Sequence, residues 1–173
     1  MACEDTVRWL YRLDEHFVWH SAFPVGRDWA FQDSGGETRL VIAADGAMTV
    51  MKGYAWDGCT PKVCLLDVLL GTPDGAVFAV TGRPKTYYAS LLHDALYQFL
   101  TDGLPLTRAQ CDECFLRLME RDGFALRHVY YAAVRIFGGL ARPITRRVRR
   151  TWGGRRIDCS EPGAGSEDLE ARR

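Results

Sequence analysis

Alternating hydrophobic and polar residues in the first half of the chain predict short β-strands. Apolar side chains recur at every second position in short runs, which is the pattern of half-buried strands. Pro24, Gly35, Gly36 and the pair Asp45–Gly46 interrupt these runs, and Asp-Gly is a strong hairpin signal. The runs cover residues 7–13 (for which a helix also fits), 16–23, 28–31, 38–43, 47–55 and 77–80. We therefore expect a small antiparallel β-rich part here.

After Pro84 the apolar residues follow the spacing of α-helices instead. Residues 86–100 carry a broad apolar stripe that fits one buried helix. Thr107 suits the N-cap of a second helix over residues 108–121, which Asp122 and Gly123 would end. A third helix is predicted from about residue 126 to 138. Only about six residues join the first two helices, so these should lie antiparallel.

These elements predict an α+β fold in one domain over residues 1–152. Residues 1–82 would form its β-rich part, and residues 83–152 its helical part with a basic end. The length of 173 residues, with 47% hydrophobic residues, suits a single core. From residue 153 onward Gly, Ser, Pro and acidic residues dominate, which predicts a disordered tail over 153–173.

The charges balance overall but are unevenly distributed. Lys+Arg and Asp+Glu number 22 each. Ile144, Val148 and Trp152 recur at helical spacing among arginines, so this stretch could lie on anionic lipid. A solvated helix or a nucleic-acid-binding patch is an alternative interpretation. The crowded arginines are Arg142, Arg146, Arg147, Arg149, Arg150, Arg155 and Arg156.

The chain shows neither a membrane span nor a secretory signal. No stretch approaches the roughly 18 apolar residues of a transmembrane helix, and the first residues lack a basic and an apolar region. We therefore expect a cytoplasmic protein with free thiols. Cys59, Cys64, Cys111 and Cys114 could also form a four-thiolate zinc site. A Cys-x-x-Cys pair within a helix, however, more often supplies two small core residues.

The residues His93, Asp94 and Asp112 carry the most informative chemistry. Asp112, near the start of the second helix, can hydrogen-bond one nitrogen of His93 midway along the first. The other nitrogen is then able to take a proton from water. Asp94 lies about 100° further round the helix. With Asp57 and the Gly58 carbonyl of the upstream loop, it offers the oxygen ligands that calcium prefers.

A purely structural interpretation of the same residues also remains open. An isolated His-Asp pair is usually a capped or surface pair. Asp112 would then be a charge near a helix start, which the helix dipole favours. Tyr97 and Phe115 would be core aromatic residues.

Four sequence blocks, in order, resemble the bacterial and fungal secreted branch of the phospholipase A2 superfamily. They also resemble a phage and bacterial family of unknown function that carries a Gly-x-x-x-Asp-Gly loop, His-Asp-x-Leu-Tyr and a later Asp-x-x-Phe. The likeness covers about residues 50–140 and excludes the β-rich N-terminal third. The blocks are Asp57-x-Cys59-Thr60, His93-Asp94-x-x-Tyr97, Asp112-x-x-Phe115-x-x-x-Met119 and the segment 130–138.

The resemblance implies a role for each matching residue. His93 would be the general base, Asp112 its orienting partner and Tyr97 a brace of the pocket. Asp94 would be the principal ligand of a calcium ion (Ca²⁺), completed by Asp57 and the Gly58 carbonyl. In the secreted branch the loop cysteine pairs with a cysteine three residues before the histidine. Here that position is Ser90, so Cys59 lacks this partner and the loop is less constrained.

The implied function is calcium-dependent hydrolysis of a phospholipid ester at a membrane surface, and no nucleic-acid partner is expected. The alternative is a non-catalytic phage or bacterial binding or assembly protein that retains the phospholipase-like helical scaffold. A metal phosphohydrolase is disfavoured, because only His16, His20 and His128 remain as ligands and two of them fall in the β-rich part. The expected membrane-binding residues are Arg146, Arg147, Arg149, Arg150 and Trp152.

Overall fold

The computed structural model describes residues 11–56, 58, 64–65, 68–69, 77–137 and 155–158. These residues form antiparallel strands and three helices, so the fold is α+β, as predicted. The strands are β1 (Tyr11–Arg12), β2 (Phe17–His20), β3 (Trp29–Gln32), β4 (Thr38–Ile42), β5 (Ala47–Val50), β6 (Ala55–Trp56), β7 (Cys64–Leu65), β8 (Val68–Leu69) and β9 (Arg155–Asp158). The helices are α1 (Tyr87–Phe99), α2 (Arg108–Arg121) and α3 (Arg127–Phe137).

The main sheet has five strands in the order β2-β5-β4-β3-β9. The predicted Asp45–Gly46 hairpin is confirmed as the turn between β4 and β5, where the Gly46 N–H donates to the Ala43 carbonyl at 2.8 Å. Gly46 has a φ of +92°, and a Cβ there would lie 2.5 Å from the Phe23 carbonyl oxygen. Only glycine fits this position without rearrangement. In the predicted run 77–80, Val77 forms one isolated bridge to Pro84 rather than a strand.

The strand β9 covers the edge of β3. Trp29 pairs with Asp158 and Gln32 with Arg155 in antiparallel register. The composition of residues 153–173 predicts a disordered tail, whereas residues 155–158 form this strand, and the remainder of that segment lies outside the described residues. The unpaired N–H and C=O groups along a strand edge can pair with another extended segment that lacks proline. The amino-acid composition of a segment does not reveal such a pairing.

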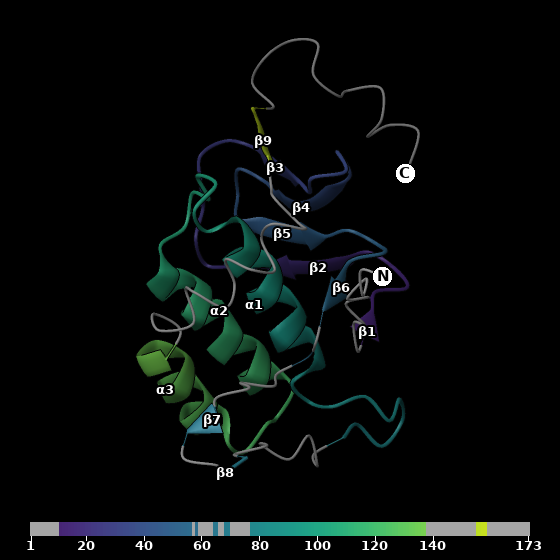
Figure 1. Cartoon of the computed structure of the whole chain (residues 1–173), viewed down its shortest axis with the longest axis vertical. Helices are drawn as coiled ribbons and strands as arrows, with labels where there is room; N and C mark the ends of the chain where they lie inside the picture. The colour runs from purple at the N-terminus through teal and green to yellow at the C-terminus, as the bar shows by residue number, and fades with distance from the viewer. Residues whose placement is uncertain are drawn as a thin grey trace, which may run out of the picture.

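The helix α1 lies between the main sheet and α2, and α3 packs on the far side of α2 (Figure 1). All three helices lie within the predicted ranges. The N-terminus of α2 has a capping box, in which the Thr107 hydroxyl accepts from the Gln110 N–H and the Gln110 side chain accepts from the Thr107 N–H. Gly123, at a φ of +64°, follows its last turn.

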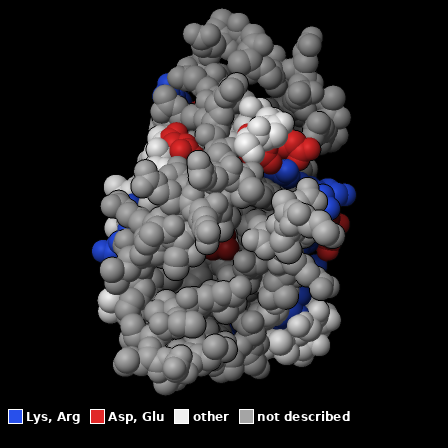
Figure 2. Space-filling model, in the orientation of Figure 1, with Lys and Arg blue, Asp and Glu red and all other residues white. Residues whose placement is uncertain are grey.

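One continuous hydrophobic core joins the sheet to the first two helices. Basic and acidic side chains lie close together along the edge of the face shown in Figure 2, so the described residues form no large region of one sign there. Among the described helices, none has the length and apolar character required to cross a bilayer. The fully buried large residues are Phe31, Leu40, Ile42, Met48, Trp56, Leu91, Leu92, Leu96, Phe99, Phe115, Leu118 and Met119.

Candidate functional site

The carboxylate of Asp112 is the centre of the candidate site. It lies in α2 with no solvent exposure. Its Oδ1 accepts hydrogen bonds from His93 Nε2 at 3.1 Å and from the Tyr97 hydroxyl at 2.5 Å. Its Oδ2 accepts from Arg135 of α3 at 3.2 Å. The predicted contact between His93 and Asp112 is therefore present, across the α1–α2 interface.

The imidazole of His93 is held in one orientation by both bonding and packing. His93 and Tyr97 are four residues apart on α1, so they share the face that meets α2. The ring of His93 packs against Tyr97 at 4.1 Å and Phe115 at 4.8 Å between centroids. The side chain is 12% exposed, and its Nδ1 bonds to no other described residue. With Nε2 donating to the carboxylate, Nδ1 has the lone pair needed to accept a proton.

Two arginines extend the network and connect it to α3. Arg108 donates from Nε to the Tyr97 hydroxyl at 3.0 Å and lies 3.8 Å from Asp112 Oδ2. Its Nη2 donates to the carbonyl oxygens of Val134 and Arg135 at 2.8 and 2.9 Å. Arg108 therefore holds the last turn of α3 next to the site by hydrogen bonds, and Arg135 of the same turn donates to Asp112.

Neither arginine is among the site residues that the sequence predicts. Residue 108 is only the start of the second predicted helix. Its position four residues before Asp112 was an available signal, because residues at this spacing are neighbours on a helix face. Arg135 lies within the segment 130–138 that carries part of the family resemblance, but its role depends on the packing of α3, which no local spacing reveals.

The partners of Asp112 keep it ionised despite its burial. Burial raises the pKa of this carboxyl, but hydrogen bonds from His93 and Tyr97, the charge of His93 and the bond from Arg135 together hold the pKa below its usual value. Burial, and then the hydrogen bond to Asp112, raise the pKa of the Tyr97 hydroxyl well above its usual range. Tyr97 is therefore a neutral donor that braces the carboxylate.

Asp94 faces a different region from His93. Ser90, Asp94 and Gln98 follow one another at intervals of four on α1. Ser90 accepts from Trp56 Nε1 at 3.2 Å, and Gln98 accepts from the Tyr54 hydroxyl at 2.9 Å. Burial, and after it the charge of Asp94, raise the pKa of Tyr54. The half-buried Asp94 thus faces the segment that leads into the predicted metal loop.

The predicted loop is described only at Gly58, and Asp57 and Cys59 lie outside the described residues. Gly58 has a φ of +75°, and a Cβ there would lie 2.8 Å from the ring of Tyr11, so its backbone packs directly on that ring. Where the resemblance would imply a disulfide at position 90, the Trp56–Ser90 hydrogen bond connects α1 to the start of this loop.

The two cysteines of α2, predicted as possible zinc ligands, are core residues. Cys111 and Cys114 are buried, and burial raises the pKa of each thiol to about 12, so they are protonated core residues at neutral pH. Among the described residues, no three His, Cys, Asp or Glu side chains cluster in a way that could hold a metal ion. The predicted membrane-binding residues Arg146, Arg147, Arg149, Arg150 and Trp152 lie outside the described residues.

Comparison of the chain with protein-family models, with curated proteins and with solved structures finds no match. Functional assignment therefore depends on the geometry of His93, Tyr97, Arg108, Asp112 and Arg135.

Proposed function

We propose that this protein is a calcium-dependent phospholipid ester hydrolase of the phospholipase A2 type. The observation that carries the proposal is the hydrogen bond between His93 and the buried, ionised Asp112, which come from two helices and are 19 positions apart. A buried carboxylate on one nitrogen of a histidine, with the other nitrogen unbonded within the described residues, is the arrangement of a general base.

In the proposed reaction His93 takes a proton from water at Nδ1. The resulting hydroxide attacks the carbonyl carbon of the lipid ester, and the negative charge of Asp112 stabilises the imidazolium that forms. When the tetrahedral intermediate collapses, the imidazolium returns its proton to the departing alkoxide. The products are a fatty acid and a lysolipid, and His93 is regenerated. Tyr97 and Arg108 act by positioning Asp112.

The residues implied as metal ligands suit a hard cation. Asp94 supplies a carboxylate and Gly58 a backbone carbonyl, which are ligand types that calcium prefers. Asp57 would add a second carboxylate from the undescribed part of the loop. A bound calcium ion would polarise the ester carbonyl and offset the charge of the oxyanion.

We also propose that the protein acts from the cytoplasm at the inner face of a membrane. The helix α3 exposes two large apolar side chains, Val129 and Ile136, each 63% exposed and seven residues apart. This spacing puts them on the same face of the helix. The helix ends at Phe137, shortly before the arginine-rich segment. Apolar residues next to a basic stretch support contact with anionic lipid.

The direct test is hydrolysis of anionic phospholipid vesicles with calcium and with a chelator. We expect fatty-acid release only with calcium, and loss of both calcium binding and release in Asp94→Asn. The exposed Glu120→Gln on α2 is a matched control that should behave as wild type. Calorimetric titration with calcium checks binding separately from turnover. Release that is insensitive to the chelator, or equal in Asp94→Asn, would contradict the metal assignment.

Replacing Arg146, Arg147, Arg149 and Arg150 with glutamine should weaken binding to anionic vesicles at least tenfold. Each arginine near such a surface contributes about 1 kcal/mol, and the effect should shrink at high salt. Co-sedimentation at two salt concentrations measures it, and Arg117→Gln is the control. These substitutions are preferable to a C-terminal deletion, which would also remove β9. Unchanged binding would exclude this segment as the membrane contact.

One observation favours the alternative, a non-catalytic binding or assembly protein. Side chains from all three described helices meet at Asp112, so the network stabilises the helical part whether or not it catalyses a reaction. If the vesicle assay gives no hydrolysis with calcium, this scaffold function becomes the better explanation.

A further inference from the structure

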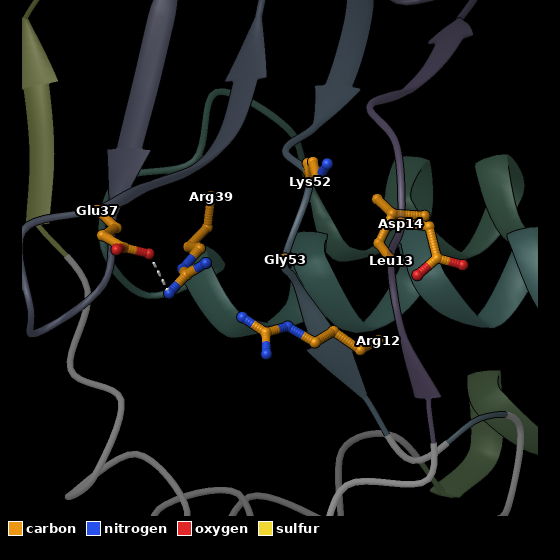
Figure 3. A pocket seen from close by; sticks show the side chains of 7 residues that line it. All are labelled: Arg12, Leu13, Asp14, Glu37, Arg39, Lys52 and Gly53. Atoms are coloured by element: carbon orange, nitrogen blue, oxygen red, sulfur yellow. Dashed lines mark ion pairs between the residues drawn. The ribbon is translucent and has the colours of Figure 1, made fainter.

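A basic hollow lies at the end of the main sheet, away from the candidate site. It is a space of about 410 Å³ beside β1, the start of β4 and the turn that joins β5 to β6. None of its lining residues bonds to His93 or Asp112 in the described part of the chain. The lining residues are Arg12, Leu13, Asp14, Glu37, Arg39, Lys52 and Gly53 (Figure 3).

Two guanidinium groups converge above Gly53. This glycine has a φ of +86°, and because it has no side chain the space next to its Cα atom stays open. At the point where a Cβ would stand, Arg39 Nη1 is 3.6 Å away and Arg12 Nη2 is 3.8 Å away. Figure 3 shows the two side chains approaching this point from opposite sides. One tetrahedral oxyanion could therefore bond to both groups at once.

The wall of the hollow formed by Arg39 is preorganised. Arg39 Nε donates to Asp33 at 2.6 Å, and another guanidinium nitrogen pairs with Glu37 at 2.6 Å. Asp33 is 8% exposed and also accepts from the N–H groups of Gly35 and Glu37. These contacts fix the guanidinium before any ligand arrives, which lowers the entropy cost of binding.

The excess positive charge comes from Arg12 and Lys52. Both are exposed, and neither forms an ion pair with another described residue. Glu37 and Asp33 more than offset the charge of Arg39, while Asp14 lies 3.5 Å from Arg83, so the four cations exceed the three anions by one charge. In Figure 3 the carboxylate of Asp14 is turned away from Gly53. The nitrogens nearest the open space are thus cationic.

We propose that this hollow is a binding site for a phosphate group. Guanidinium groups match the geometry of phosphate oxygens, and a lysine adds a mobile point charge. A bound phosphate would also relieve the repulsion between Arg12 and Arg39. The same chemistry occurs in a soluble phosphate monoester and in a lipid headgroup. The site is independent of the proposed ester hydrolysis, because it shares none of the residues assigned to that reaction.

The test is calorimetric titration of the full chain with inorganic phosphate at low ionic strength. We expect saturable binding that Arg12→Gln weakens at least about tenfold, since a hydrogen bond between charged groups is lost. Lys52→Gln should have a smaller effect in the same direction. Arg117→Gln removes the same charge from α2 and is the matched control. Thermal melting checks that every variant is folded.

Affinity for phosphate that is equal in wild type and Arg12→Gln would overturn the proposal, and so would an equal loss in Arg117→Gln. Two further titrations separate the possible sources of the phosphate group. Phenyl phosphate represents soluble monoesters, and vesicles containing phosphatidate represent lipid. Dependence on Arg12 in either titration supports the site and identifies its ligand class, whereas independence of Arg12 in both would exclude it.

Discussion

His93→Ala should lower ester hydrolysis by roughly 10²–10⁴-fold while the protein stays folded. This is the usual contribution of a positioned general base. The fold should persist because Asp112 keeps its bonds from Tyr97 and Arg135 when the imidazole is removed. Fatty-acid release from vesicles at saturating calcium measures the activity, and far-ultraviolet circular dichroism checks the fold.

Two further variants sharpen this test. His128 is exposed on α3, so His128→Ala should retain full activity and controls for the loss of a histidine. His93→Gln keeps a side chain able to donate to Asp112 but offers no base, so it should be as inactive as His93→Ala. Full turnover in His93→Gln would remove His93 from the mechanism.

Asp112→Ala should destabilise the protein by about 2–3 kcal/mol. Leaving a buried donor without its acceptor usually costs about 1–3 kcal/mol. Here Tyr97 and His93 lose their acceptor, whereas the side chain of Arg135 is 43% exposed and can turn to water. The expected loss is a large part of the 5–15 kcal/mol by which domains are typically stable. Urea unfolding measures the change in the free energy of unfolding.

The neighbouring residue Glu113 supplies the control. Its ion pair with Arg117 is exposed, so Glu113→Ala should change the free energy of unfolding by less than about 1 kcal/mol. A similarly small change in Asp112→Ala would show that the network contributes little to stability.

The stability contribution of Asp112 should also depend on pH. Its pKa is lowered in the folded protein, so the contribution is complete above the usual carboxyl value of 3.8 and is lost as pH falls through the lower folded value. The difference in stability between wild type and Asp112→Ala should therefore shrink in acid, as pH falls through the lowered pKa of Asp112.

Local sequence patterns predict the helices, the hairpin turn and the side of the candidate site that α1 supplies. The capping box at Thr107 and the Asp45–Gly46 turn act through neighbouring residues, so their positions follow from the sequence. His93 and Tyr97 share a face because of helical spacing. A short connection makes α1 and α2 antiparallel, which is enough to bring His93 toward Asp112.

The parts that the sequence did not predict depend on long-range packing. Arg135 reaches Asp112 only because α3 folds back onto α2, and no local spacing specifies that return. The convergence of Arg12 and Arg39 over Gly53 likewise requires that β1 and β4 lie on either side of one turn. Neither feature has a periodicity that could be read along the chain.

The pairing of β9 with β3 has a consequence for folding during synthesis. Trp29 pairs with Asp158 although most of the chain lies between them, so this pairing has a large entropy cost of loop closure. Proteins with such distant contacts tend to fold slowly. The ribosome makes β3 long before it makes β9, the strand that pairs with it. Until then the edge of β3 is open to strands of other molecules, and the nascent chain should depend on chaperones most during this interval.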